Sequence, residues 1–241
     1  YKRQYLDPLP SYIVAETQRV HSSFNQTMTA TGRLSTSSPN FQNIPIRTED
    51  GKEIRKAIKA QSNEYQIFSA DYSQVELRVM AHLSGDVSLI SALNNGEDIH
   101  TFTAKNIFNV DNDDMVLPEM RRIAKIVNFG IMYGAGPFRL SQELDIPFGE
   151  AKQIKDAYFE KYQGIEQYIE NSKLQIKETK SVETLLGRKR AVWDSDSQNK
   201  IRRDAAERMA INMPIQGTAA EMIKLAMIKI PVSYTHLRAH E

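Results

Sequence analysis

Residues 120–134 read MRRIAKIVNFGIMYG and combine the apolar spacing of a helix with an unusual polar face. Arg121, Lys125, Phe129 and Tyr133 recur every four residues, so a helix places these four side chains along one face. We call these four residues the cation–aromatic row. The other side of the helix carries the apolar residues that are expected to be buried, Ile123, Ile126, Val127 and Ile131.

The cation–aromatic row has two interpretations. It can be a basic solvated turn that leads into a buried aromatic end. Alternatively, its cations bind the phosphates of a nucleoside triphosphate, and its aromatic rings lie against the base and the sugar. Gly130, Gly134 and Gly136 would then let the chain and the ligand approach closely, although neither the P-loop nor the dinucleotide fingerprint is present.

Helical patterns continue on both sides of this segment, with glycine and proline at their boundaries. The predicted helices span residues 73–84, 86–94, 99–108, 118–133, 138–144, 148–162, 164–180, 198–211 and 216–229. Pro214 and Gly217 are expected to separate the last two helices, and Pro231 is expected to end the second of them.

Extended structure is expected at both ends of the helical region. Residues 64–71 predict a strand in which Ile67 and Phe68 are buried, and residues 182–193 predict β structure on either side of a glycine turn. Residues 29–47 predict an ordered loop with short extended pieces. This order of mixed, helical and mixed segments predicts an α+β fold, mostly helical, with an inserted helical subdomain.

The composition excludes several classes of protein. The 241 residues are 41% hydrophobic and 25% charged, as in ordinary globular domains, and no apolar run is long enough to span a bilayer. The polar start with its two prolines does not resemble a secretory signal. Cysteine is absent, which excludes disulfides and thiolate chemistry and fits a reducing compartment, so a cytoplasmic location without a membrane partner is expected.

Charge gives only a local indication of a nucleic-acid partner. The chain has 31 basic and 30 acidic residues, so its net charge of +1 provides no global attraction to phosphates. The cations gather at GRKR (187–190) and at Lys200, Arg202, Arg203 and Arg208. Arginine, asparagine and glutamine side chains can donate to phosphates and to base edges. They are equally typical of an ordinary surface.

Asp71 follows the predicted strand and precedes the first predicted long helix. One interpretation is a helix N-cap, with Gln74 as its capping-box partner. The other is a carboxylate at a strand end that holds a magnesium ion, which prefers one or two carboxylates together with substrate phosphates. His100, at the start of a predicted helix, could reach a phosphate.

Several motifs, read in order, resemble the family A DNA polymerases of the bacterial DNA polymerase I type. They are TATGRLSTSSPNFQNIPIR (29–47), DYSQVELRVMAHLSGD (71–86), GEDIHTFTA (96–104), MRRIAKIVNFGIMYG (120–134), VETLLGRKR (182–190) and AAERMAINMPIQGTAAEMIKLAM (205–227). The resemblance covers residues 1 to about 230, and so many long motifs in one order make it very specific.

The resemblance implies a right-hand polymerase architecture with an incomplete palm sheet. Residues 1–85 would be the first part of the palm, with the connection to a thumb, and residues 86–180 would be the fingers. Residues 181–230 would be the second part of the palm, and residues 231–241 are expected to be an irregular or foreign tail. The chain is expected to be a monomer.

The resemblance also implies template-directed DNA synthesis, in which a nucleotide is transferred from a dNTP to a primer 3′-hydroxyl with two magnesium ions. Asp71 would be the metal-bridging carboxylate, the backbone carbonyl of Tyr72 would be a second metal ligand, and Lys125 would be a general acid for the leaving pyrophosphate. The implied dNTP-binding residues are Tyr72, Gln74, Glu76, His100, Arg121, Lys125, Phe129 and Tyr133. The implied contacts to primer–template DNA are Arg33, Asn40, Gln42, Asn43, Arg208, Asn212 and Gln216.

One motif of the family does not occur in these 241 residues. A hairpin that reads close to His-Asp-Glu is expected about thirty residues after Gln216. The closing residues 238–241 read RAHE and have no aspartate between histidine and glutamate. The polypeptide is therefore expected to extend primers negligibly, and the alternative function is a catalytically inactive fragment that binds DNA or nucleotides. A generic helical interaction domain is a third interpretation.

Overall fold

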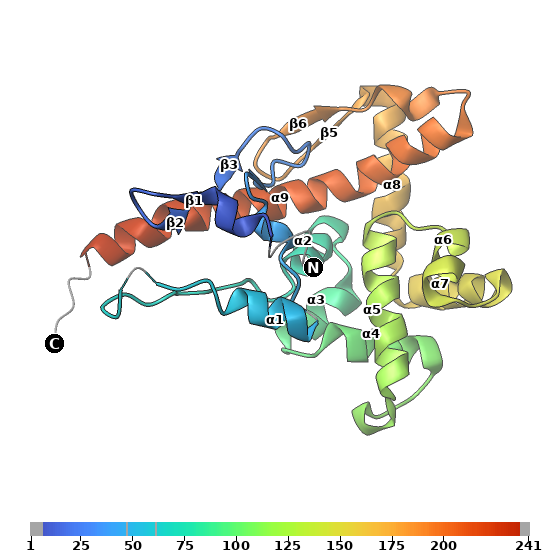
Figure 1. Cartoon of the computed structure of the whole chain (residues 1–241). Coiled ribbons are helices and arrows are strands. Elements are labelled where there is room, and N and C mark those ends of the chain that lie inside the picture. Colours follow the sequence, from blue (N-terminus) through green and yellow to red (C-terminus); the bar gives the residue numbers. More distant parts are fainter. Residues whose placement is uncertain (1–6, 47, 61, 237–241) are drawn as a thin grey trace. The chain divides into compact units, whose positions relative to one another are not determined.

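The computed structural model describes residues 7–46, 48–60 and 62–236 and divides the chain into two compact units (Figure 1). The first unit ends at Ser73, and the second begins at Gln74. The palm and finger boundaries at 85 and 180 remain predictions. Of the expected tail, residues 237–241 lie outside the described residues. Among the described residues, no helix combines the length and the apolar character needed to cross a membrane.

The first unit consists of short elements around a small apolar cluster. Its elements are a 3-10 helix η2 (Leu9–Tyr12), an antiparallel pair β1 (Ile13–Val14) and β2 (Arg19–Val20), a second antiparallel pair β3 (Ser23–Asn25) and β4 (Ser35–Ser37), a 3-10 helix η3 (Phe41–Asn43) and α1 (Glu49–Arg55). Ile44 and Ile54 are buried against Leu9 and Phe41. β4 and η3 lie within residues 29–47, for which a loop with short extended pieces was expected.

The prediction of a strand at residues 64–71 is wrong. This segment is irregular, and the side chains of Ile67 and Phe68 are 59% and 68% exposed instead of buried. A strand is held by the hydrogen-bond ladder to its neighbour. None of the three strand pairs in the described part of the chain includes this segment, so the local preference for extended backbone is not fixed as a strand.

The second unit is mostly helical, and seven of its helices start and end within two residues of the predicted bounds. They are α2 (Val75–Ser84), α3 (Val87–Asn94), α4 (Ile99–Phe108), α5 (Pro118–Met132), α6 (Pro137–Leu144), α7 (Phe148–Lys161) and α8 (Gln163–Thr179). The 3-10 helix η4 (Asp113–Met115) precedes α5. The antiparallel pair β5 (Ser181–Glu183) and β6 (Lys189–Ala191), η5 (Trp193–Asp196) and α9 (Lys200–His236) complete it.

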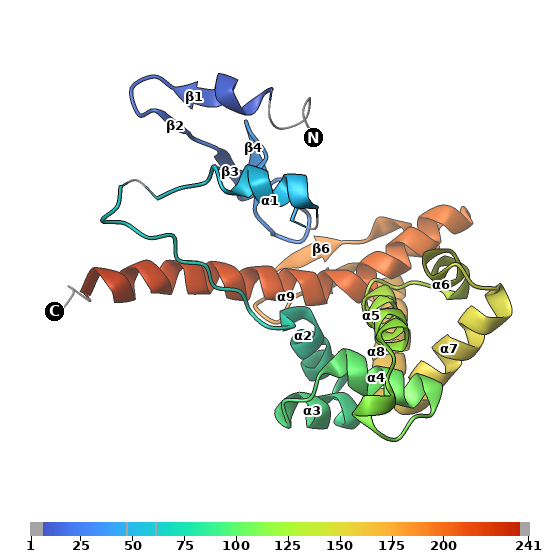
Figure 2. The ribbon, with the colours of Figure 1, turned by 60° about the horizontal axis from the view of Figure 1, so that its bottom comes forward.

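α9 is one continuous helix where two were expected (Figure 2). The predicted breaks at Pro214 and Gly217 and the predicted end at Pro231 are wrong. A proline inside a helix removes one hydrogen bond and typically destabilises the helix by about 3 kcal/mol. Pro214 and Gly217 are buried, however, and the neighbouring Met213 and Ile215 are almost fully buried in the two main cores. Tertiary packing of this stretch therefore outweighs the local helix-breaking preference.

The main hydrophobic core joins the helices of the second unit and packs against the side of α5 that lies opposite the cation–aromatic row. Val127 and Ile131, on the side of α5 opposite the cation–aromatic row, are 0% and 1% exposed. Complete burial of such a side chain contributes about 1.5–3 kcal/mol. This buried stripe determines which face of α5 stays accessible, and the accessible face carries the row.

Asp86 connects the starts of α3 and α8. Its Oδ1 accepts a hydrogen bond from the backbone N–H of Leu89 at 2.9 Å, and its Oδ2 accepts one from the N–H of Gly164 at 2.9 Å. A Cβ atom at residue 164 would lie 2.8 Å from the Cα of Asp86, so only glycine allows this approach.

Replacing Asp86 with alanine should lower the free energy of unfolding by about 2–4 kcal/mol, because it removes a helix cap and leaves the Gly164 N–H without its acceptor. Asp86→Asn keeps an acceptor for the cap and should cost less. Urea unfolding followed by circular dichroism measures both variants. A loss below about 0.5 kcal/mol for Asp86→Ala would contradict this role.

Candidate functional site

The candidate site is built where the N-terminus of α4 meets the exposed face of α5. Asp98 is the N-cap of α4 and accepts hydrogen bonds from the backbone N–H and the hydroxyl of Thr101, at 3.1 and 2.6 Å. Pro118 starts α5, where its fixed φ suits the first helical turn. α4 and α5 pack against each other, and the start of α4 contacts α5 both at Arg121 in its first turn and at Phe129 in its last.

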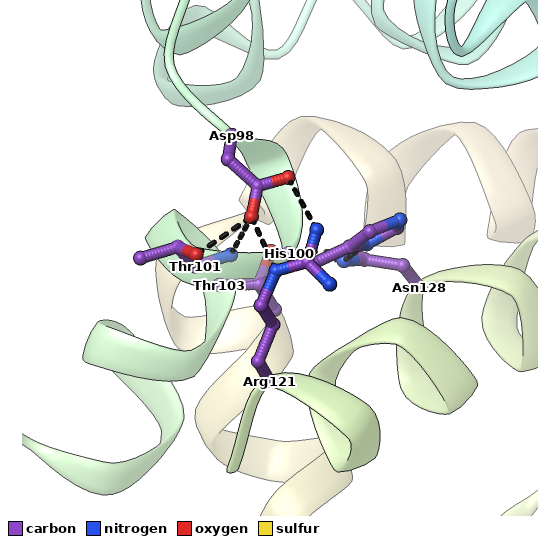
Figure 3. A network of polar contacts seen from close by, with 6 residues as sticks. All are labelled: Asp98, His100, Thr101, Thr103, Arg121 and Asn128. Atoms are coloured by element: carbon purple, nitrogen blue, oxygen red, sulfur yellow. Dashed lines mark hydrogen bonds and ion pairs between the residues drawn. The ribbon is translucent and has the colours of Figure 1, made fainter. Parts of the chain in front are cut away.

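Arg121 on α5 forms a forked ion pair with Asp98 (Figure 3). Nε lies 2.7 Å from Oδ2, and one terminal nitrogen lies 3.2 Å from Oδ1. Burial raises the pKa of the Asp98 carboxyl, but hydrogen bonds from Arg121 and Thr101 outweigh that effect and lower its pKa to about 2. Asp98 is thus ionised at every physiological pH and holds the guanidinium in one place.

His100 is the second residue of α4 and is only 5% exposed. Its Nδ1 lies 3.2 Å from Nδ2 of Asn128 on α5. Asn128 in turn contacts the hydroxyl of Thr103, which lies 2.8 Å from the hydroxyl of Tyr162. Burial lowers the pKa of His100, and Arg121 and Lys125 lower it further against the opposing effect of Asp98, so the ring is neutral at neutral pH.

The aromatic half of the cation–aromatic row continues from His100. The ring of Phe129 lies with its centroid 5.7 Å from that of His100 and 6.4 Å from that of Tyr133, and the last two rings are within 21° of parallel. The hydroxyl of Tyr133 donates to Oε2 of Glu76 on α2 at 2.9 Å. Glu76 is 8% exposed, so its carboxylate is held at the edge of this surface.

The structure therefore brings six predicted residues together on one unit. They are Glu76, His100, Arg121, Lys125, Phe129 and Tyr133. Arg121 and Lys125 are exposed, whereas Phe129 and Tyr133 are half-buried. Chemically, this surface offers two cations and a neutral imidazole at one end and flat rings with a fixed carboxylate at the other.

Asp71 and Tyr72 lie at the end of the first unit, and both side chains are exposed. The N-cap interpretation of Asp71 is wrong, because α2 begins at Val75 and Gln74 is its cap residue. Gln74 makes no side-chain cap hydrogen bond and has a φ of +53°, an uncommon backbone conformation for this residue type. The metal-binding role of Asp71 and Tyr72 and the dNTP-binding role of Gln74 remain predictions.

Within the described ranges, no group of three or more histidine, aspartate or glutamate side chains is arranged to hold an ion. Asp71 still offers an exposed carboxylate, and magnesium requires only one or two carboxylates when substrate phosphates supply the other oxygens. The chemistry of the residues present thus fits a magnesium ion that arrives with a triphosphate.

The predicted DNA contacts of the first unit include two side chains that also stabilise their own loop. Asn40 accepts hydrogen bonds from the hydroxyl of Thr36 at 2.7 Å and from the backbone N–H of Gln42 at 3.0 Å. The side-chain amide of Gln42 donates to the carbonyl of Leu34 at 3.1 Å. Arg33 and Asn43 are both exposed. Their contacts with DNA remain predictions.

The predicted DNA contacts of the second unit lie four residues apart on α9, so Arg208, Asn212 and Gln216 share one face. Nδ2 of Asn212 is buried and is the one such side-chain atom without a hydrogen-bond partner among the described residues. A buried donor of this kind favours an acceptor that arrives with a ligand.

Two glycines expected to admit a ligand are instead packed against protein. A Cβ at Gly134 would lie 3.0 Å from Cγ of Arg208, and a Cβ at Gly130 would lie 2.9 Å from Cδ2 of Leu140. The backbone of Gly134 has a φ of +72°, which also favours glycine. Close packing of α5 against its neighbours explains these two positions.

Two arginines of the local basic cluster form hydrogen bonds within the protein. Nε of Arg188 donates to Oε1 of Glu221 on α9 at 3.0 Å, and Arg203 donates to the carbonyl of Ser197 at 3.0 Å. These two arginines hold the β5–β6 hairpin and the start of α9. The clustering of GRKR with later cations is therefore partly architectural.

Sequence reasoning did not select Asp98, Asn128, Thr103 or Tyr162. Asp98 could have been found from the sequence, because an aspartate three residues before Thr101 at a helix start is a typical N-cap. The sequence indication for Asn128 is weaker and consists only of a polar residue on an otherwise apolar side of a helix. Thr103 and Tyr162 are 59 residues apart, and no local pattern relates them.

Comparison with known proteins gives consistent matches. The model of the family described as DNA polymerase family A matches residues 1–240. The thermostable DNA polymerase I of Thermus aquaticus is 51% identical over 229 residues, which are 95% of this chain and 27% of that protein. DNA polymerase I of Bacillus caldotenax is 48% identical over 226 residues, 94% of this chain and 26% of that protein. The chain thus spans about a quarter of the length of these relatives.

A solved structure with a similar fold is the POL domain of Pol1 from M. smegmatis, in complex with DNA primer-template and dNTP. The TM-score is 0.88 and the sequence identity is 43%. The match covers 97% of this chain and 41% of that one.

Proposed function

This chain belongs to DNA polymerase family A, and from that premise we propose that it forms part of an enzyme that copies DNA from a template. The reaction is transfer of a nucleotide from a dNTP to the 3′-hydroxyl of a primer. The observation that carries the proposal is the unbroken series of side-chain contacts in one unit that runs from His100 along Phe129 and Tyr133 to Glu76, with Arg121 on the same face of α5. The mostly helical α+β fold and the resemblance of the motifs are confirmed.

The basic end of this surface would bind the triphosphate. Arg121 is held in a forked pair with Asp98 and keeps donors available, and Lys125 adds a mobile point charge one turn further along α5. The imidazole of His100 can donate one hydrogen bond without carrying charge. In the proposed reaction, Lys125 protonates the leaving pyrophosphate as a general acid.

The aromatic end would bind the nucleoside. Phe129 presents a half-buried ring for the sugar, and Tyr133 stacks on it where a template base can lie. The carboxylate of Glu76, fixed by the Tyr133 hydroxyl, would exclude a ribose 2′-hydroxyl from this place. Removing that hydrogen bond should loosen the selection for deoxyribose.

Magnesium would be held by the Asp71 carboxylate and the backbone carbonyl of Tyr72 together with oxygens of the triphosphate. When bound, it supplies positive charge that offsets the negative charge of the phosphates. The proposed contacts to primer and template are the exposed or half-buried polar side chains Arg33, Asn40, Gln42, Asn43, Arg208, Asn212 and Gln216. The relative from M. smegmatis, solved with DNA primer-template and dNTP, supports these partners.

Binding of a primer–template that ends in a dideoxynucleotide tests the proposal without requiring chemistry. Fluorescence anisotropy should show that the dNTP complementary to the next template base raises the affinity of the chain for this DNA by about 10-fold or more, since base pairing adds to the triphosphate contacts. The three other dNTPs should raise it much less. An equal effect of all four dNTPs, or none, would contradict template-directed selection.

A second candidate is binding of DNA and nucleotide without chemistry by these 241 residues alone. It is favoured by the single candidate metal-binding carboxylate, Asp71. A primer with a free 3′-hydroxyl separates the two functions. Extension by the chain no greater than that by Asp71→Ala, together with selective dNTP binding, assigns the binding role to this polypeptide.

A further inference from the structure

We propose that Asn128 is a positioning residue that fixes His100 in the tautomer with its proton on Nε2, so that the ring presents an N–H to the triphosphate. Asn128 is itself oriented by a buried chain of hydroxyl groups from Thr103 and Tyr162. The identity of the ligand rests on the proposed function. The assignment of the tautomer does not, because it follows from the hydrogen bonds of the unit.

The contact between Asn128 and His100 determines the tautomer. Nδ2 of an asparagine can only donate, and it lies 3.2 Å from Nδ1 of His100. A neutral imidazole has one protonated and one unprotonated nitrogen. Nδ1 must therefore be the acceptor, and the proton must be on Nε2. Among the described residues, Nε2 makes no hydrogen bond and is not a fully buried atom, so its N–H is accessible to a ligand.

The buried hydroxyl groups of Thr103 and Tyr162 supply hydrogen-bond partners for the other side of the asparagine amide. Tyr162 and Thr103 are both 0% exposed, and their hydroxyl oxygens are 2.8 Å apart. The hydroxyl of Thr103 lies 3.3 Å from Oδ1 of Asn128 and 3.1 Å from Nδ2. If Tyr162 donates to Thr103, and Thr103 donates to Oδ1, both hydroxyl protons have acceptors, and the two Nδ2 protons are directed at Nδ1 of His100 and at the Thr103 oxygen.

The charged groups around His100 make the tautomer important for binding. Asp98 at the start of α4 is paired with Arg121, while Arg121 and Lys125 on α5 act on the ring together with its burial to keep it neutral. The ring of Phe129, which is also on α5, lies against the ring of His100. A neutral ring with its proton on Nδ1 would turn a lone pair toward a phosphate. With the proton on Nε2, it offers a donor instead.

Nitrogen-15 NMR of protein with labelled histidine tests the assignment directly. The His100 signals are identified by their loss in His100→Gln, and His21 and His82 provide references in the same spectrum. Wild-type protein should show the Nε2–H tautomer from pH 6 to pH 8. A wild-type spectrum with the proton on Nδ1 would overturn the proposal, and this measurement requires no variant to fold.

The variant Asn128→Asp keeps the shape of the side chain and replaces its donor with an acceptor. His100 should then carry its proton on Nδ1, and the added negative charge should bring its titration into the range from pH 6 to pH 8. Asn171→Asp, an equal change on the exposed face of α8, should alter neither property. Unchanged His100 signals in a folded Asn128→Asp protein would overturn the proposal.

Binding of dATP with magnesium gives a second readout. Relative to wild type, Asn128→Asp should bind dATP about 10-fold more weakly at pH 8 and recover as the pH falls to 6, because protonation of Nδ1 and Nε2 restores the donor. If neither wild type nor Asn128→Asp bound dATP, but the NMR spectra of both showed the expected tautomers of His100, the proposed function would fail and the positioning by Asn128 would stand. If the affinity of Asn128→Asp for dATP relative to that of wild type stayed constant from pH 6 to pH 8, the donor role of His100 would be overturned.

Discussion

Replacing Arg121 with alanine is expected to weaken the binding of dATP with magnesium by about 10- to 100-fold. A hydrogen bond between charged partners contributes about 1.5–3 kcal/mol, which corresponds to that range. Two changes act in the same direction. The triphosphate loses a guanidinium, and the carboxylate of Asp98 is left without the cation that it holds at 2.7 Å.

The charge on Asp98 makes this effect independent of pH in the neutral range. Arg121 and Thr101 outweigh the burial of Asp98 and lower its pKa to about 2, and loss of Arg121 moves that pKa toward the ordinary value of 3.8. The carboxylate therefore stays ionised above about pH 5 in the variant and repels phosphate. The double variant Asp98→Asn with Arg121→Ala should recover part of the lost affinity.

Arg122→Ala is the matched control for this experiment. Arg122 is the next residue on α5, but it is exposed and paired with Glu119 in the same turn, at 2.6 Å. Its loss should leave dATP affinity within about 2-fold of wild type, since such exposed pairs contribute little. Isothermal titration calorimetry at one salt concentration compares all four proteins. Equal losses of dATP affinity for Arg121→Ala and Arg122→Ala would indicate a nonspecific effect of charge and would contradict a triphosphate site at Arg121.

Replacing Tyr162 with alanine is expected to lower the free energy of unfolding by about 3–5 kcal/mol, as for other large aromatic side chains removed from a core. Tyr162 is fully buried between α7 and α8, with its ring centroid 4.7 Å from that of Tyr158 and 6.4 Å from that of Phe102. The alanine variant leaves a cavity and removes the hydroxyl partner of Thr103.

Tyr162→Phe separates these two contributions. It keeps the ring and removes only the hydroxyl, so it should cost about 1 kcal/mol. Thermal and urea unfolding of both variants measure the difference. If phenylalanine destabilised the protein as much as alanine, the hydroxyl chain rather than ring packing would dominate at this position. If alanine cost less than about 1 kcal/mol, the residue would not be part of the core.

The elements that were predicted well are those whose signal is local. α5 could be recognised because its apolar residues recur with the period of a helix, and because Pro118 and Gly134 mark its ends. The same periodicity placed Arg121 and Tyr133 on one face. The contacts that complete the site, such as that between Tyr133 and Glu76, join residues 57 apart in the chain. Only the motif resemblance connected these two before the structure was known.

The two wrong predictions of secondary structure share one physical cause. Pro214 and Gly217 disfavour a helix locally, but their burial within α9 is worth more than the local preference. Residues 64–71 favour a strand locally, but a strand needs a neighbour to complete its hydrogen bonds. In both cases, distant parts of the chain decide the outcome. The hydrogen-bonded chain of Asn128 was missed for the same reason, since its members come from α4, from α5 and from the junction between α7 and α8.

A crystal structure of the chain with dATP and magnesium would locate the triphosphate directly. Its oxygens should lie within hydrogen-bond distance of the Arg121 guanidinium, the Lys125 ammonium and Nε2 of His100, with the sugar against Phe129. Density for the triphosphate at any other place, with the surface between α4 and α5 unchanged, would contradict this placement.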